Sequence, residues 1–265
     1  MSRWRPVCRG TAVPWPWRSR LRIMLVAAAV CPCPPLLVPE VATGAAPELD
    51  AARTACADAV GLLAAARPDR LYVVGPAPEG AHGAFPAGSA GTFAGFGVDH
   101  AVRLGPTPAA DGPTPGGDRP LPTSLAVGAW LLDRAGWADA PIEGLGVDEG
   151  ATPAVCSGVG RGLADSAGRV ALLVMGDGSA CRTVKAPGYL DERAAGFDAE
   201  AARALGTADV AALLALDPEL AYELKAAGRA PWQVLAGAAE GAGLEGRLLF
   251  EDAPYGVGYF VAAWS

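Results

Sequence analysis

The feature that most constrains the fold is the segment 24–40, in which two apolar runs flank a proline-rich turn. The first run, 25–30, has the length and composition of a buried strand. The turn CPCPP at 31–35 follows it, and it cannot continue a strand or lie inside a helix, because proline fixes φ and has no backbone N–H. We expect this turn to hold Cys33 in one orientation at the carboxyl end of a strand, where ligands bind in open α/β sheets.

Strand patterns and helix patterns alternate along the rest of the chain. The predicted strands are 25–30, 70–75, 99–104, 142–147, 169–175, 244–251 and 256–264. The predicted helices are 47–66, 122–135, 152–167, 197–204, 210–216, 218–227 and 230–242. Strand, helix and strand over 25–75 predict two parallel neighbouring strands joined by a right-handed crossover. The whole pattern predicts an α/β fold, a layered domain with a central mixed, mostly parallel sheet flanked by helices.

Two segments have no periodic pattern within this alternation. Residues 81–97 are rich in glycine, and we interpret them as irregular. Residues 105–120 are rich in proline, glycine and aspartate, and their length indicates either a functional lid or a mobile insertion. We find no internal repeat and no linker after residue 23, so we expect 24–265 to form a single domain.

Residues 1–23 differ in composition from everything that follows. They contain six arginines, three tryptophans and no acidic residue. We interpret them as a disordered N-terminal extension, with a true start at Met24 and a signal peptide as the open alternatives. The next apolar run is too short to span a bilayer, and no small-residue cleavage site of the usual kind follows it. No membrane association is expected.

The charge and the cysteines narrow the environment and the partners. Without residues 1–23 the formal net charge changes from −7 to −13, which makes nucleic acid an unfavourable partner. Six scattered cysteines are not the framework of a disulfide-rich secreted domain, so a reduced, cytoplasmic location is expected. A homo-oligomer and a partner subunit that supplies missing groups both stay open.

Three strand-end sequences resemble those of one family, the class III extradiol ring-cleavage dioxygenases. CPCPPLLVPE at 31–40 resembles the family's proline-histidine-proline-proline opening. GDGSACR at 176–182 resembles its glycine-aspartate-leucine-serine-histidine turn, and PYGVGYFVA at 254–262 is similar to its closing strand. The resemblance covers 24–265. It implies an α/β fold with a non-haem Fe(II) at the strand ends, bound by two histidines and a carboxylate, and a further histidine as acid/base.

The residues at the matching positions differ from those of the family. The two ligand histidines, the acid/base histidine and the ligand carboxylate fall, in that order, on Cys33, Ala77, Ala180 and a position near Ala226. Glu223 lies one turn before that last position. Of the matched positions, only Asp177 and Ser179 keep a polar side chain. The resemblance therefore implies a metal site that has lost most of its ligands.

Other residues could still carry chemistry. The chain has two histidines, and His82 is a candidate pocket residue, whereas His100 is interpreted as structural. Cys31 and Cys33, with Cys181, could bind Zn²⁺ as thiolates. The alternative is that Cys33 is a small buried hydrophobic residue. As a nucleophile, Cys33 would need a base, and His82 is the candidate.

The turn 176–179 could hold an anion through its backbone N–H groups, although a plain turn is the simpler interpretation. The pocket candidates are Cys33, Asp177, Ser179 and His82. The sequence predicts an extradiol-dioxygenase-like pseudoenzyme: the family opens catechol-type rings with Fe(II), but this chain is degenerate at the metal site and no cofactor is expected. The alternatives are a non-catalytic module that binds a small aromatic or other small molecule or a partner, and a cysteine-based zinc site.

Overall fold

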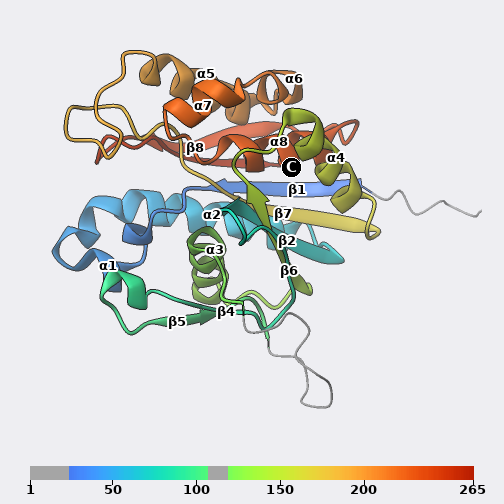
Figure 1. Ribbon diagram of the computed structural model, residues 1–265. Coiled ribbons are helices and arrows are strands. Elements are labelled where there is room, and N and C mark those ends of the chain that lie inside the picture. Colours follow the sequence, from blue (N-terminus) through green and yellow to red (C-terminus); the bar gives the residue numbers. More distant parts are fainter. Residues whose placement is uncertain (1–23, 107–118) are drawn as a thin grey trace, which may run out of the picture.

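The computed structural model describes residues 24–106 and 119–265 (Figure 1). Its strands are β1 (Met24–Cys31), β2 (Arg70–Ala77), β3 (Gly83–Phe85), β4 (Ala90–Thr92), β5 (Ala101–Arg103), β6 (Ile142–Asp148), β7 (Arg169–Met175), β8 (Gly246–Asp252) and β9 (Tyr259–Trp264). Seven of them form a mixed sheet in the order β3-β6-β2-β7-β1-β9-β8. The four central strands are parallel to one another, and β3, β9 and β8 pair antiparallel towards the edges. The predicted α/β class and mixed sheet are confirmed.

Strands β1 and β2 are parallel, as expected, but they are not neighbours. Strand β7 lies between them and pairs with both, so that Val170 is in register with Leu25 on one side and with Arg70 on the other. The prediction of adjacent strands was wrong because sequence order does not set spatial order. From Val170 to Met175 every residue of β7 is fully buried, and a strand that is apolar on both faces is most stable at the centre of a covered sheet.

Helices cover both faces of this sheet. The α-helices are α1 (Pro39–Ala42), α2 (Asp50–Ala65), α3 (Thr123–Arg134), α4 (Pro153–Ala164), α5 (Ala194–Thr207), α6 (Val210–Leu214), α7 (Pro218–Glu223) and α8 (Arg229–Ala239). Short 3-10 helices cover Pro35–Leu37, Thr43–Leu49 and Ala94–Phe96. In Figure 1, α4 to α8 lie above the sheet, and α2 and α3 lie below it. Alternate residues of each central strand pack into the two hydrophobic cores on opposite faces of the sheet. In β7, Leu172 and Val174 belong to the upper core, and Leu173 and Met175 belong to the lower core.

The glycine-rich segment 81–97 is more regular than the sequence predicted. It contains β3 at the edge of the main sheet, and β4, which pairs with β5 in a separate two-stranded sheet. Strands of three residues are too short to show an alternating pattern, so β3 and β4 could not be predicted from periodicity. Of the predicted 105–120 loop, residues 107–118 lie outside the described residues, as does the predicted extension 1–23.

Helix α7 ends earlier than predicted. We expected Gly228 to stop it, but the helix ends at Glu223, and Lys225 has a φ of 55°. That left-handed conformation turns the chain out of the helix three residues before the glycine. Gly228 instead begins α8 as its N-cap residue. In the described part of the chain, no helix is long and apolar enough to cross a membrane.

Candidate functional site

The proline turn and the end of β7 meet at the carboxyl edge of the sheet. Because β1 and β7 are parallel neighbours, with Cys31 opposite Met175, the residues that follow them lie side by side. The backbone N–H of Cys33 donates to Oδ1 of Asp177 over 2.8 Å. Cys33 is 7% exposed. The structure therefore brings two of the predicted pocket residues together, with Cys33 buried and Asp177 partly exposed.

Burial governs the ionisation of this pair and of a tyrosine beside it. It raises the pKa of Asp177 from 3.8 to about 7, although the N–H of Cys33 acts in the opposite direction. Burial, with the Asp177 charge added, raises the pKa of the Cys33 thiol well above its ordinary value. Burial and Asp177 likewise raise the pKa of Tyr259, the first residue of β9. A thiol held in its neutral form is a poor nucleophile and a poor metal ligand. We call Cys33, Asp177 and Tyr259 the strand-end cluster.

The turn after Asp177 is held by hydrogen bonds of its own. The fully buried Asp198 of α5 accepts from the backbone N–H of Ser179 over 2.7 Å and pairs with Arg182 over 2.9 Å. The hydroxyl oxygen of Ser179 accepts from the N–H of Cys181, and Gly178 donates to the carbonyl of Gly258. The N–H groups of Gly176, Gly178 and Ser179 are bonded within the protein, which favours the plain-turn interpretation over the anion-holding one. Ser179 acts here as a structural residue.

The remaining predicted residues lie apart from the strand-end cluster. Cys31 belongs to the core under α2 and α3, beside Cys56, whereas Cys181 belongs to the core on the other face of the sheet. The thiol of Cys181 donates to the carbonyl of Leu224. His82 is exposed in the loop after β2, where its carbonyl accepts from Arg119. Within residues 24–106 and 119–265, no three His, Cys, Asp or Glu side chains are grouped to hold a metal ion.

The donor set does not fit the Fe(II) site that the resemblance implies. Ala77, Ala180 and Ala226, which stand where the family has ligand or acid/base groups, are buried, and a methyl group has no lone pair. Cys33 and Asp177 remain, and a facial site needs three donors from two histidines and a carboxylate. The described residues at these positions therefore do not supply the ligands of such a site.

A cleft of about 480 Å³ opens beside the strand-end cluster. Its lining residues are Glu149, Ala221, Tyr222, Glu223, Lys225, Ala226, Ala227, Arg229 and Ala230. We call it the α7–α8 cleft, because all of its lining residues except Glu149 belong to these helices and the turn between them. The N–H of Gly228 donates to the carbonyl of Asp177 over 2.8 Å, so this turn is fixed to the end of β7. A smaller hollow of about 260 Å³ lies at the amino end of β1, away from the edge where ligands are expected.

Arg229 joins three parts of the cleft wall. It is the first residue of α8 and is only 3% exposed. Its Nη1 donates to the carbonyl of Ala151 over 2.5 Å and to Oε1 of Gln233 over 3.0 Å, and its Nη2 donates to the carbonyl of Glu149. Partial burial raises the pKa of the Glu149 carboxyl, Asp148 raises it further, and Arg229 lowers it. The wall thus combines a buried cation with a carboxyl whose pKa partial burial raises.

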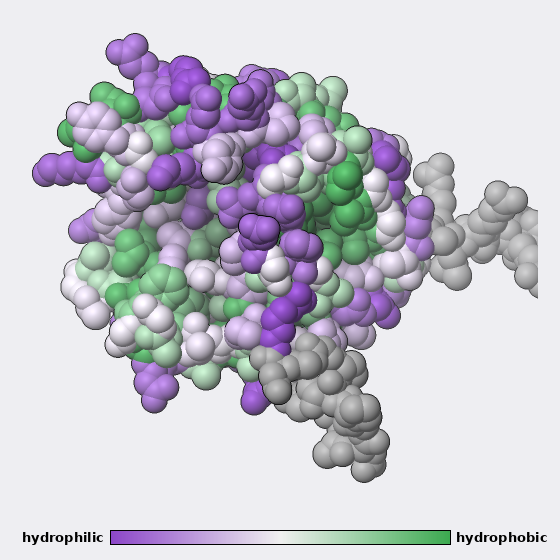
Figure 2. All heavy atoms as spheres, in the orientation of Figure 1, coloured by the Kyte–Doolittle hydropathy of each residue, from purple (hydrophilic) through white to green (hydrophobic). Residues whose placement is uncertain are grey.

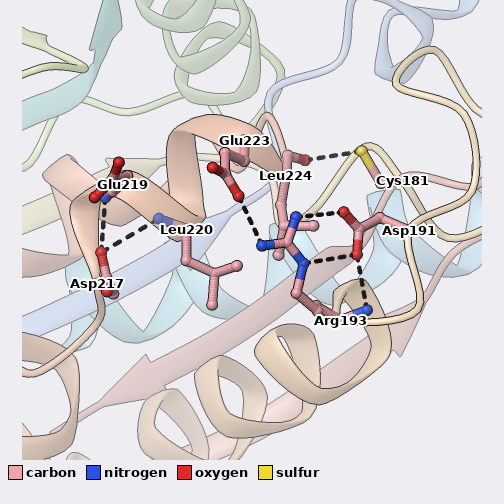
Figure 3. A network of polar contacts seen from close by, with 8 residues as sticks. All are labelled: Cys181, Asp191, Arg193, Asp217, Glu219, Leu220, Glu223 and Leu224. Carbon is pink, nitrogen blue, oxygen red and sulfur yellow. Dashed lines mark hydrogen bonds and ion pairs between the residues drawn. The ribbon is translucent and has the colours of Figure 1, made fainter.

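The loop after β7 fixes the outer side of the cleft (Figure 3). Arg193 pairs with Asp191 over 2.6 Å and with Glu223 over 2.7 Å, and thereby ties α7 to this loop. Asp217 caps α7 by accepting from the first N–H groups of the helix. Space-filling Figure 2 shows hydrophilic surface in the middle of this face and apolar surface beside it, over α4, where Val155 and Val159 are exposed.

Sequence reasoning missed several residues that organise this region. Glu149 follows strand β6 directly, and a carboxylate at a strand end was a signal that could have been read. Tyr259 stands in the closing-strand sequence, but its pattern gives no hint that it approaches Asp177. The burial of Arg229 and Asp198 had no sequence signal, because both look like ordinary charged residues of helices.

Comparisons with known proteins assign no family. No family model matches the sequence, and no curated protein matches it. Among solved structures, the crystal structure of the uncharacterized protein JW3007 from Escherichia coli K12 is similar at 14% identity, with 90% of this chain and 99% of that chain covered and a TM-score of 0.46. At that score the likeness supports no statement about fold family or activity.

Proposed function

We propose that this chain is a small-molecule-binding protein on an extradiol-dioxygenase-like scaffold that has lost its metal site. One observation carries the proposal: the four positions that match the family's site residues are Cys33, Ala77, Ala180 and a position near Ala226, and all four residues are buried. Replacing imidazole by methyl removes the coordinating atom itself, so iron binding would be abolished rather than weakened.

The α7–α8 cleft supports the binding part of the proposal. Its volume of about 480 Å³ is within the range that holds small organic ligands, which is roughly 300–1,000 Å³. It opens at the carboxyl end of parallel strands, the usual place for ligands in open α/β sheets. Four small alanine side chains line it and leave space for a ligand. Charged side chains of the lining, among them Lys225 and Arg229, can orient that ligand. The zinc alternative has less support, because Cys31 and Cys181 lie in different cores.

Two measurements on the full chain test this function. The first is oxygen uptake after the protein has been loaded anaerobically with Fe(II) and mixed with catechol in air; we expect the rate of buffer alone. The second is saturation-transfer NMR with a mixture of small aromatic compounds, for which we expect binding. Ala227→Trp, which fills the cleft, should remove that binding, and Ala199→Trp on the exposed face of α5 should not. Catechol-dependent oxygen uptake, or no binding of any compound, would contradict the proposal.

A further inference from the structure

We infer that the α7–α8 cleft takes a small aromatic carboxylate, whose carboxylate group pairs with Arg229. This inference rests on the proposed function and names the ligand class for the same cleft.

Arg229 is a buried cation that makes no direct ion pair. Burial lowers its pKa, although the carboxyls of Asp148 and Glu149 are close enough to raise it. It is 3% exposed, and within the described part of the chain no carboxylate oxygen lies within 4.0 Å of its guanidinium nitrogens. Its protein partners are two backbone carbonyls and the amide oxygen of Gln233, all of them neutral. Buried charges are normally paired, because a charge removed from water without a counter-ion is destabilising. A ligand carboxylate in the cleft would supply the missing counter-ion.

The hydrogen bonds of Arg229 leave donors suited to such a ligand. A guanidinium has five N–H groups. Both N–H groups of Nη1 and one of Nη2 are used, so Nε–H and the second N–H of Nη2 have no partner among the described residues. The side of the guanidinium that carries Nε–H is therefore the side from which a ligand carboxylate can accept a charge-assisted hydrogen bond.

The rest of the wall sets the size and the charge of the ligand. Lys225 adds a second positive charge at the mouth, and Tyr222, which is 81% exposed, offers an aromatic face there. The alanines inside leave space for one ring. Glu149, whose backbone carbonyl accepts from Arg229, also lines the cleft, and its carboxyl opposes a second negative charge on the ligand. The wall therefore favours a monocarboxylate over a dicarboxylate or a phosphate.

The test compares benzoate, benzamide and phthalate on the full chain, with affinity measured by saturation-transfer NMR and by the shift in thermal unfolding midpoint. We expect benzoate to bind at least about tenfold more tightly than benzamide, because charge-assisted pairs are about twice as strong as neutral ones. Phthalate should bind more weakly than benzoate. Lys225→Gln should weaken benzoate binding several-fold. Lys185→Gln removes the other lysine of the chain, which is exposed outside the cleft, and should leave the affinity unchanged.

The outcomes separate this inference from the proposed function. If benzamide binds as tightly as benzoate, and Ala227→Trp removes both, the carboxylate inference is overturned while the binding function stands. If benzoate binding survives Ala227→Trp, the ligand lies elsewhere and the inference is likewise overturned. If neither compound nor any other aromatic compound binds, both proposals fall. Arg229→Lys keeps the positive charge but removes the planar guanidinium, so this variant should lose most of its preference for benzoate over benzamide. If Arg229→Lys does not fold, the affinity of Lys225→Gln for benzoate still tests the inference.

Discussion

The strand-end cluster and the α7–α8 cleft are neighbours with opposite character. They meet where the N–H of Gly228 donates to the carbonyl of Asp177. In the cluster, burial favours the neutral forms of Cys33, Asp177 and Tyr259. In the cleft, Lys225 is exposed, and the buried Arg229 keeps its charge among neutral hydrogen-bond partners of the wall. The difference indicates that Cys33 and Tyr259 at the strand ends belong to the core, whereas the cleft, for which we propose ligand binding, lies one layer further out.

Asp177→Asn should show the largest effect on stability. The folded state raises the pKa of this carboxyl from 3.8 to about 7, so it binds the proton more tightly than the unfolded chain does. The free energy of unfolding should therefore fall as the pH rises from about 4 to about 7 and stay low above that. Asn does not ionise, and its Oδ1 can still accept from Cys33. At about 1.4 kcal/mol per pH unit between the two pKa values, the variant should gain at most about 4 kcal/mol at pH 8.

Urea unfolding of the wild type and of Asp177→Asn, repeated from pH 4 to pH 8, measures this gain. Other carboxyls whose pKa burial raises, such as those of Glu149 and Asp198, are present in both proteins and cancel in the difference. Parallel curves for the two proteins would mean that water reaches Asp177, and the contrast between the cluster and the cleft would then be lost.

Gly176→Ala tests the contact that joins the two regions. A Cβ at this position would lie 2.5 Å from the Cα of Gly228, so the end of β7 and the α7–α8 turn would have to separate. We expect a loss of about 1–3 kcal/mol in the free energy of unfolding, together with weaker ligand binding in the cleft. Gly162→Ala in α4 is the matched control, because its Cβ would meet nothing within 4 Å and should add up to about 1 kcal/mol. Equal stability of the two variants would show that this approach is not close.

Glu149→Gln tests how the negative charge in the α7–α8 cleft affects the affinity for benzoate. Removing this carboxylate removes the repulsion of a bound benzoate, an interaction worth on the order of 1 kcal/mol near the surface. Benzoate should bind about fivefold more tightly at pH 8, as measured by saturation-transfer NMR. Asp148→Asn, at the exposed neighbouring position that does not line the cleft, should have a smaller effect. Weaker binding in Glu149→Gln would assign this residue to ligand contact instead.

Ala208→Gly tests a substitution outside both the strand-end cluster and the α7–α8 cleft, where only the free energy of unfolding should change. Ala208 ends α5 with a φ of 51°, in the left-handed region that favours glycine. The substitution should raise the free energy of unfolding by about 0.5–1 kcal/mol in thermal or urea unfolding and leave benzoate affinity unchanged. A loss of stability would show that Ala208 contributes packing that outweighs the relieved backbone strain.

The sequence predicted those elements whose pattern is long and periodic. Strand β7 was placed at its observed bounds, and α3 and β6 to within a residue at either end. The meeting of Cys33 and Asp177 followed from two strands with parallel carboxyl ends. The position of β7 between β1 and β2 did not follow, because it depends on long-range pairing. Arg229 could not be recognised either: its burial comes from packing against Ala151 and Gln233, which a one-dimensional pattern does not contain.

The most direct test of the central claim is the metal content of the protein. The full chain would be incubated anaerobically with Fe(II) or with Zn(II), dialysed, and analysed for metal per chain by mass spectrometry, with Cys33→Ser as the matched variant. If the strand ends have lost their ligands, both proteins should retain far less than one metal ion per chain. One ion per wild-type chain, lost in a folded Cys33→Ser protein, would show that the strand-end cluster is still a metal site and would contradict the account.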